Sequence, residues 1–472
     1  MSLATFKGGA HPYEGKILSE NCAIQQLDFD GEFVFPMSQG IGAPAKPIVQ
    51  KGDQVLAGQK IAEAGGFISA NVLSSVSGTV KAVEPRMLTS GFPGLCVVVE
   101  SDGKYETIEG VGTKRDYKAL SKEEIRSIVK EAGIVGIGGA GFPTNVKLMP
   151  KNDNAIDYFI ANGSECEPML TSDYRLMLEE AERVIGGVDV CLQLFPNAKG
   201  VIAIENNKPQ AIAHMRELVK DNPRIEVMEL LTKYPEGGER QLINAVTGRY
   251  ISSSMLPADA GVVVQNVATC AAIYDAVALS TPLMEKVITV SGDAVAEPHN
   301  VRVRLGSIYG RILEACGGLK CEASKYICGG PMMGQSMFDL NCPVTKPSSA
   351  ICVFVHDEVA ENPTTACIRC GRCVNGCPEF LVPPMLMKAA RTKDLAQFEK
   401  LGGMECMECG SCSYICPARR PLTQSFKEMR KLVAADRRIK AAEKKQREEQ
   451  EAAAKKEKEE AEAKAKAAEK EA

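Results

Sequence analysis

The sequence predicts a multidomain protein that combines α/β and all-β parts and ends in a charged helix. Three observations support this fold class. Short apolar runs between Gly and Pro turns fill residues 31–108, and helical patterns alternate with strand patterns over residues 120–275. The tail, Arg437 to Ala472, contains no Gly, Pro or aromatic residue and interleaves Glu with Lys, which favours a solvated single helix.

Composition limits the kind of protein that this chain can be. Its 472 residues suit about three domains, and a hydrophobic content of 45% is enough to build their cores. No stretch approaches the ~18 uncharged apolar residues of a membrane span, and residues 1–20 lack the apolar core of a signal peptide. The net charge of −4 provides no positive field for nucleic acid. We therefore expect a cytoplasmic protein, or one attached to a membrane only through partners.

The all-β part contains two loosely repeated segments, PIVQKGDQVLAGQKIAEAG and VLSSVSGTVKAVEP, each with strands around a Gly-containing turn. The pair resembles the hammerhead of biotinyl and lipoyl carrier domains, which implies a barrel-sandwich fold. Those carriers modify a lysine at a hairpin tip, whereas this sequence has no lysine between Lys60 and Lys81. We therefore expect a structural domain and not a carrier of a covalent cofactor.

The α/β part has recognisable elements. SKEEIRSIVKEAG predicts a helix with Ser121 as its N-cap and with Ile125, Ile128 and Val129 on one face. AIDYFIAN and GVIAIEN predict buried strands, and TSDYRLMLEEAERVIGGVDVCLQL predicts one helix. Short strands and the helix SIYGRILEACGG follow over residues 285–335.

Two cysteine runs near the C-terminus share the spacing C-x2-C-x2-C-x3-C-P, and PPMLMKAARTKDLAQFEKL between them has a helical pattern. This spacing is the bacterial ferredoxin signature for a [4Fe–4S] cluster, in which the fourth cysteine of each run ligates the other cluster. The alternative, a pair of zinc sites, prefers paired C-x2-C units with a long gap. The runs therefore predict two [4Fe–4S] clusters. The predicted ligands are Cys367, Cys370, Cys373 and Cys416 for one cluster, and Cys406, Cys409, Cys412 and Cys377 for the other.

A glycine-rich loop, GIGGAGFPTNVKL, starts at Gly136 and contains the pattern G-x-G-x-x-G. A dinucleotide-binding Rossmann loop requires a strand before this pattern and a helix that opens inside it. Here a helical pattern precedes the loop and Pro143 follows it, so the context disfavours that interpretation. The density of small residues also exceeds what a structural turn needs. It lets backbone N–H groups approach an anion or a flat ring, and Lys147 can neutralise a phosphate.

The loop resembles that of the flavin-binding subunit of NADH dehydrogenases, where G-x-G-G-A-G-F-P-T-x-x-K wraps FMN. NGSECEP, YPEGGERQLINAVTG and VVVQNVATC match further stretches of that family in the same order. Ile137, Leu148, Ser164 and Gly238 stand where the family usually has Arg, Trp, Asp and Glu. The resemblance implies the following positions in binding FMN and shaping the NADH pocket: Gly136, Gly138, Gly139, Gly141, Lys147, Asn162, Glu165, Glu167, Tyr234, Gly237, Glu239, Asn266 and Thr269.

The order of the parts resembles the C subunits of Rnf complexes, which are membrane-bound, ion-translocating ferredoxin:NAD oxidoreductases. Supporting stretches are FKGGAHP near the N-terminus and GGPMMG at the end of a small β-grasp-like (SLBB-like) unit. The resemblance implies a peripheral subunit on the cytoplasmic side of the membrane. Such a subunit exchanges electrons between NAD(H), FMN and two [4Fe–4S] clusters, and the complex couples this to Na+ or H+ transport. It also implies integral membrane subunits and a ferredoxin-like iron–sulfur subunit as partners.

Two other functions stay open from the sequence. One is a non-catalytic two-cluster electron conduit, prompted by the departures at the flavin loop. The other is the NADH-reacting subunit of a soluble hydrogenase or formate dehydrogenase. We expect no catalytic acid–base residue, because hydride transfer to flavin needs none. The expected order is an N-terminal segment (1–30), a barrel-sandwich domain (31–108), an FMN/NADH-binding α/β domain (120–275), an SLBB-like domain (285–335), a linker (340–365), a ferredoxin module (366–420) and a helical tail (421–472).

Overall fold

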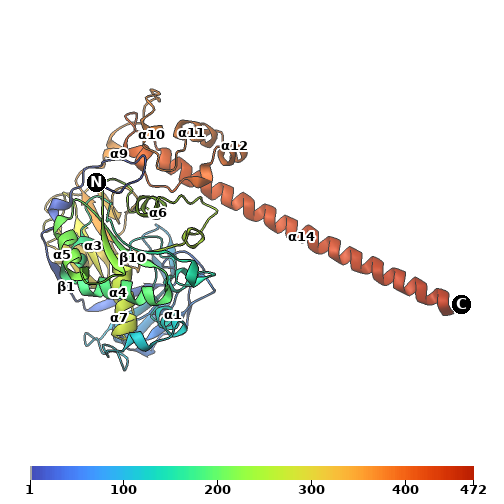
Figure 1. Ribbon diagram of the computed structural model, residues 1–472, viewed down its shortest axis with the longest axis horizontal. Helices are drawn as coiled ribbons and strands as arrows, with labels where there is room; N and C mark the ends of the chain where they lie inside the picture. The colour runs from blue at the N-terminus through green and yellow to red at the C-terminus, as the bar shows by residue number, and fades with distance from the viewer. Residues whose placement is uncertain (1–2, 472) are drawn as a thin grey trace. The chain divides into compact units, whose positions relative to one another are not determined.

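The computed structural model describes residues 3–471, with side chains described through residue 456. The chain divides into two compact units, Met1–Ala366 and Cys367–Ala472, and Figure 1 colours the chain by residue number from blue at the N-terminus to red at the C-terminus. Within the described residues, we find no helix that combines the length and the apolar character needed to cross a membrane.

Two small antiparallel sheets form the first part of the larger unit. Their alternating apolar side chains, among them Phe33, Phe35, Ile61 and Val97, are almost fully buried and make one shared core. One sheet has the order β2 (Gly31–Pro36), β8 (Pro93–Ser101), β7 (Gly78–Met87) and β4 (Gln54–Val55); the other has β3 (Lys46–Pro47), β5 (Lys60–Glu63) and β6 (Val72–Leu73).

A four-stranded parallel sheet is the centre of the α/β part. Its order is β11 (Ile225–Leu230), β10 (Lys199–Glu205), β9 (Tyr158–Gly163) and β12 (Val262–Asn266). One face packs against α1 (Lys122–Glu131), α3 (Ser172–Glu179), α4 (Ala181–Leu194), α5 (Pro209–Val219) and α7 (Val267–Ala278), and the other face against α6 (Glu239–Thr247). The carboxyl ends of all four strands therefore meet at one edge of the sheet, where ligands of open α/β folds bind.

Most predicted elements of this part are present. Ser121 caps α1 in a reciprocal capping box with Glu124, and the two predicted strands are β9 and β10. The single helix predicted for TSDYRLMLEEAERVIGGVDVCLQL is wrong, because Glu180 (φ −136°) separates α3 from α4. The break contains no Gly or Pro. Glu180 forms ion pairs with Arg183 and with Arg302 of a distant strand, and the second of these contacts is not visible in the local sequence.

A six-stranded mixed sheet forms the third part of the larger unit. Two of its strands lie outside the expected SLBB-like range: one comes from the N-terminal segment and one from the expected linker. The buried run Ala350–Phe354 pairs with β13 and β15, although nearby Pro343 and Pro347 suggest a linker. The order is β1 (Ile24–Leu27), β14 (His299–Arg304), β13 (Glu285–Ser291), β17 (Ala350–Phe354), β15 (Lys325–Cys328) and β16 (Gln335–Met337), with α8 (Tyr309–Ala315) beside it.

The smaller unit is helical. Leu386, Phe398, Phe426 and Met429 form its buried core. Its helices are α10 (Arg372–Asn375), α11 (Pro383–Arg391), α12 (Leu395–Lys400), α13 (Ser411–Tyr414) and α14 (Leu422–Glu471), and the short α9 (Glu358–Glu361) precedes it. The helical pattern predicted between the cysteine runs corresponds to α11 and α12. The predicted tail helix is the C-terminal continuation of α14. Ion pairs at i,i+4 spacing, such as Lys440 with Asp436 at 2.7 Å, lie along this helix.

Candidate flavin and iron–sulfur sites

The glycine loop connects α1 with the short helix α2 (Thr144–Lys147). At its base, Val135 pairs with Pro143 and the Gly136 N–H donates to the Phe142 carbonyl at 2.8 Å. Gly138 (φ +82°) and Gly141 (φ +66°) adopt left-handed backbone that other residues rarely take. No strand precedes the loop, so the structure also lacks the context of a Rossmann loop.

Contacts from the carboxyl edge of the parallel sheet hold this loop. The Ile137 N–H donates to Oγ1 of Thr269 in the first turn of α7 at 2.9 Å. Asn266, the last residue of β12, caps α7 by accepting from the Ala268 N–H at 2.8 Å. A Cβ on Gly138 would lie 3.4 Å from Asn266 Nδ2, so a side chain there would crowd the loop against β12.

A second group of predicted residues meets at the end of β9. Asn162 Nδ2 donates to the Gly237 carbonyl at 2.9 Å, and the Gly237 N–H donates to Sγ of Cys166 at 3.3 Å. Lys147 Nζ lies 2.6 Å from a carboxylate oxygen of Glu239 and donates to the Val264 carbonyl at 3.2 Å. Residues of the loop, β9, β12 and the start of α6 therefore lie together, and the ion pair between Lys147 and Glu239 among them is partly exposed.

The residues of this site fit a flavin in two respects. Oγ of Ser164, a fully buried residue beside Gly237, has no hydrogen-bond partner among the described residues. Buried polar atoms are almost always satisfied, so an unpaired one in a pocket leaves capacity for a ligand. At Gly139, a Cβ would find no atom within 4 Å, so the tip of the loop has open space over its backbone.

Three other predicted residues have structural partners in the protein. The Glu165 carboxylate accepts from the N–H groups of Asp173 (2.7 Å) and Tyr174 (3.3 Å) at the start of α3. Glu167 accepts from the N–H groups of Met332 (3.1 Å) and Met333 (2.8 Å), in the GGPMMG turn. Tyr234 is 1% exposed, and its backbone pairs with Ala10. These residues thus make contacts that hold neighbouring segments of the protein in place.

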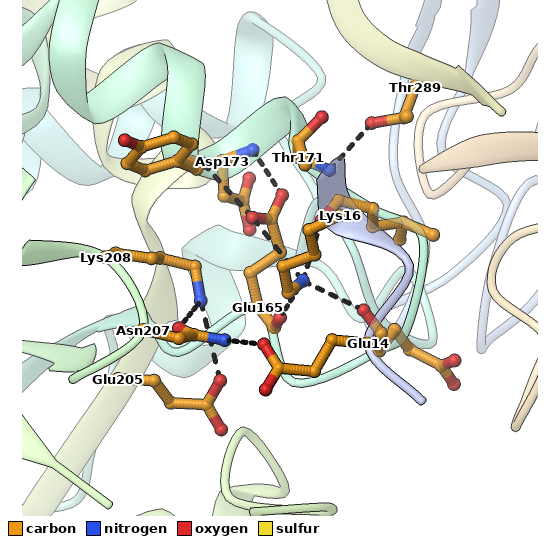
Figure 2. A network of polar contacts seen from close by, with 12 residues as sticks. Glu14, Lys16, Glu165, Thr171, Asp173, Glu205, Asn207, Lys208 and Thr289 are labelled. Carbon is orange, nitrogen blue, oxygen red and sulfur yellow. Dashed lines mark hydrogen bonds and ion pairs between the residues drawn. The ribbon is translucent and has the colours of Figure 1, made fainter. Parts of the chain in front are cut away.

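Sequence reasoning missed two buried lysines that hold the loop after β9. Lys16 Nζ donates to the carbonyls of Glu165 (2.8 Å), Glu167 (3.1 Å) and Leu170 (2.7 Å). Lys208 Nζ donates to the neighbouring carbonyl of Ser164 at 2.6 Å, and Figure 2 shows Lys16 and Lys208 approaching this loop. Burial lowers the pKa of Lys16 and raises the pKa of Glu165 to about 7. Neither lysine belongs to a motif, so the sequence carried no signal for them.

The two cysteine runs adopt the same local backbone. Arg369 (φ +58°) and Glu408 (φ +62°) take left-handed conformations at equivalent positions, and so do Gly371 (φ +76°) and Gly410 (φ +86°). Each run then continues into a one-turn helix, α10 or α13. The repeat in sequence is therefore a repeat in structure.

Cysteines of the two runs lie close to one another, and the crossed ligand sets stay a prediction. Cys377 of the first run lines one cavity together with Cys406, Cys409 and Cys412 of the second, and the walls include Leu381, Pro383 and Phe426. Cys373 has the remaining cysteines as neighbours. Burial raises the pKa of its thiol, and the nearby thiols of Cys416, Cys367 and Cys370 raise this pKa further. Within the described residues, no group of three or more His, Cys, Asp or Glu side chains is placed so that it could hold a metal ion.

Comparison with known families agrees with this division of the chain. Residues 4–104 match the RnfC barrel sandwich hybrid domain, 129–275 the Nuo51 FMN-binding domain, 287–336 the SLBB domain and 359–417 the 4Fe-4S dicluster domain. The predicted fold class is confirmed, and so are the predicted FMN and [4Fe–4S] cofactors.

Several relatives match over most of the chain. The C subunit of the proton-translocating ferredoxin:NAD(+) oxidoreductase complex of Clostridium ljungdahlii is 45% identical, and the match covers 84% of this chain and 87% of that one. The Na(+)-translocating counterpart from Acetobacterium woodii is 42% identical, with 92% and 98% covered. The C subunit of the ion-translocating oxidoreductase complex of Rhodobacter capsulatus is 39% identical, with 89% and 82% covered. The chain belongs to this family of C subunits of ion-translocating ferredoxin:NAD(+) oxidoreductase complexes.

Among solved structures, an air-oxidized NAD+-reducing [NiFe]-hydrogenase gives a TM-score of 0.48 at 22% identity, covering 61% of this chain and 55% of that one. This likeness is too weak to bear on the assignment.

Proposed function

We propose that this chain is the peripheral electron-transfer subunit of an ion-translocating ferredoxin:NAD oxidoreductase. In this role it exchanges electrons between NAD(H), FMN and two [4Fe–4S] clusters. The observation that carries the proposal is the presence, on one chain, of the glycine loop held against the ends of β9 and β12 and of two groups of cysteines drawn from both runs. Bound FMN supplies the exchange between two-electron hydride chemistry and single-electron chemistry.

The residues around the pocket bind and orient the flavin and the nucleotide. The backbone at Gly139 gives the cofactor close access, since a Cβ there would meet no atom within 4 Å. Lys147 neutralises phosphate charge and releases Glu239, its present partner, to a ribose or nicotinamide group. Asn162 and Asn266 fix the two strand ends that flank the loop. Thr269 holds the loop through the Ile137 N–H.

Glu165, Glu167 and Tyr234 contribute in a different way from the residues that face the cofactor. Glu165 fixes the start of α3, Glu167 fixes the GGPMMG turn, and Tyr234 fixes the segment before Gly237. Their role in the proposed site is to shape the loops that carry the contacting groups. No general base is required, because hydride transfer to flavin moves no substrate proton.

The cysteine module provides the one-electron relay. Cys367, Cys370, Cys373 and Cys416 ligate one cluster, and Cys406, Cys409, Cys412 and Cys377 ligate the other. Backbone N–H groups of Leu381 and Glu408 lie 3.4 Å from Cys377 and Cys406 sulfur atoms, and such N–H···S contacts are among the factors that set cluster potentials.

The remaining parts of the proposal concern the complex. Its integral membrane subunits and a ferredoxin-like iron–sulfur subunit are the partners of this chain, which lies on the cytoplasmic side of the membrane. Electron transfer in the complex is coupled to Na+ or H+ transport; the relatives quoted above include one named for each ion.

The test is an anaerobic titration of the reconstituted full chain with NADH, in which flavin absorbance and cluster EPR signals are followed together. The proposal predicts bleaching of the flavin and partial reduction of at least one cluster. A chain that retains both clusters but shows no response to NADH would instead be a non-catalytic electron conduit.

A further inference from the structure

The N-terminal segment, residues 3–18, lies against the two loops that carry the flavin-site residues. Ala4 and Ala10 pair with Leu230 and Tyr234 through their backbones, so the segment follows the chain from β11 toward Gly237. Phe6 accepts from the Lys233 ammonium, and Thr5 Oγ1 donates to Glu236 at 3.0 Å. We call residues 3–18 the N-terminal strap.

The end of the strap inserts a buried ammonium into the loop after β9. Lys16 is 7% exposed, and its three carbonyl acceptors all belong to residues 165–170. The strap also contacts this loop through its backbone, since the Met169 N–H donates to the Glu14 carbonyl at 2.7 Å. A lysine ammonium has three donors, so each one is used.

The loop that Lys16 holds has a strained backbone. Glu165 (φ +46°) and Met169 (φ +68°) both take left-handed conformations without being glycine. Such conformations persist only where surrounding contacts impose them. The three hydrogen bonds from Lys16 span both strained residues and are among the contacts that impose this shape, together with the Met169 N–H to Glu14 bond and the bonds that the Glu165 carboxylate accepts.

Contacts lead from this loop to both sides of the flavin pocket. On one side, the Glu165 carboxylate accepts from the Asp173 N–H, and the Asp173 carboxylate accepts from Asn266 Nδ2 at 2.6 Å, next to Gly138. On the other side, Cys166 accepts from the Gly237 N–H, and Gly237 accepts from Asn162. A displacement of residues 165–170 would therefore move both Asn266 and Gly237, on the two sides of the proposed site.

We propose that Lys16 is a positioning residue for the flavin site: its ammonium holds residues 165–170 in the shape that aligns Asn162, Gly237 and Asn266 around the cofactor. This inference rests on the proposed function and adds to it a residue about 120 positions before the glycine loop. The Lys16 ammonium is buried and its three donors are used by backbone carbonyls, so we expect its effect on affinity and geometry and not on a chemical step.

The test compares Lys16→Met with the wild-type full chain and with Lys51→Met, which removes an exposed lysine of the same unit. The first measurement is FMN affinity, from quenching of flavin fluorescence on binding. Lys16→Met removes three charge-assisted hydrogen bonds from buried carbonyls, and we expect binding about 10- to 100-fold weaker. Lys51→Met leaves the affinity unchanged, and cluster EPR signals are the same in all three proteins.

Hydrogen exchange of the FMN-free proteins gives a readout that does not depend on the cofactor. Lys16→Met speeds amide exchange in residues 165–174, whereas β10 in the centre of the sheet keeps its wild-type protection. Lys16→Gly in the presence of ethylammonium recovers part of the affinity, which a general loss of stability would not allow. If Lys16→Met does not fold, Lys16→Gln, whose amide retains two donors, replaces it and gives an intermediate affinity.

Two results separate the failure of this inference from the failure of the proposed function. Wild-type protein that does not bind FMN overturns the proposed function. Wild-type protein that binds FMN, together with a Lys16→Met variant of equal affinity and unchanged exchange in residues 165–174, overturns the inference alone.

Discussion

In the glycine-loop pocket, Ile137 contacts Thr269 and Lys147 contacts Glu239, pairs that are 132 and 92 positions apart in the sequence. In the cysteine module, all predicted ligands lie within residues 367–416, and each run builds its own loop from its own left-handed residues. The pocket therefore forms only when strands, helices and the N-terminal strap have assembled, whereas each cysteine loop is specified locally. The two regions also lie in different compact units of the chain. A change in one is thus expected to leave the other intact, and this expectation can be tested.

The largest expected effect follows from removal of a cluster ligand. Cys370→Ala empties or degrades the cluster of the first set, so the iron content falls by roughly half and one reduced-cluster EPR signal disappears. FMN affinity stays at its wild-type value, because Cys370 lies outside the unit that holds the pocket.

Cys321→Ala is the matched control, since Cys321 is also exposed but belongs to neither run. Loss of FMN from Cys370→Ala, or retention of both clusters, would contradict the separation of the two regions.

A smaller effect with the opposite pattern is expected for Lys147→Ala. The substitution removes a positive charge and leaves the Glu239 carboxylate without its partner at the mouth of the pocket. We expect about tenfold weaker FMN binding by fluorescence titration, as for one charge-assisted contact. Both cluster EPR signals stay unchanged. Lys151→Ala, at an exposed lysine four residues further on, serves as the control. Equal FMN affinities of the two variants would show that Lys147 does not contribute to FMN binding.

The two cluster sites are themselves unequal, which predicts different rates of cluster loss. Cys367 and Cys370 are exposed, whereas Cys377 and Cys409 are buried in a cavity that Leu381 and Phe426 help to enclose. Under an oxidant with a chelator, we expect the cluster of the first set to decay severalfold faster. The Cys370→Ala protein should show only the slow phase; a single phase of equal rate in both proteins would show that burial does not protect the second cluster.

The smallest expected effect is a pH dependence in the stability of the larger unit. Burial raises the pKa of Glu165 from 4.5 to about 7, so between these values the folded state binds a proton that the unfolded state has lost. Stability from this group is therefore fully present below about pH 4.5 and is lost as the pH rises toward 7. Differential scanning calorimetry at pH 5 and pH 7.5 measures the slope.

Glu165→Gln flattens this slope, because the amide does not titrate. Glu63→Gln, at an exposed glutamate, keeps it. An unchanged slope in Glu165→Gln would mean that other buried groups, such as Glu236 with its pKa raised to about 8, account for the dependence.

Local patterns in the sequence predicted what local structure determines. Cysteine spacing alone predicted that Cys377 groups with the cysteines of the second run, and the capping of α1 followed from Ser121 and the residues after it. The glycine loop was predicted from its density of small residues, which its left-handed backbone at Gly138 and Gly141 requires.

Features that depend on distant residues were missed. The break at Glu180 has no Gly or Pro to signal it and comes with an ion pair to the distant Arg302. The strand Ala350–Phe354 is recognised only once β13 and β15 lie beside it. Glu165 occupies a family position, yet in this structure its carboxylate faces the start of α3. Lys16 belongs to no motif, and its role is visible only from the three carbonyls around it.

The proposed function requires that electrons from NADH reach the clusters through FMN on the same chain. The direct measurement uses full-length protein that retains both clusters but has been depleted of FMN. Samples are frozen with NADH before and after FMN is restored, and the EPR signals of reduced clusters are compared, with dithionite as the control for cluster integrity. We predict reduction by NADH only after FMN is restored. Reduction of either cluster by NADH in the depleted protein, or of neither in the restored protein, would contradict this route.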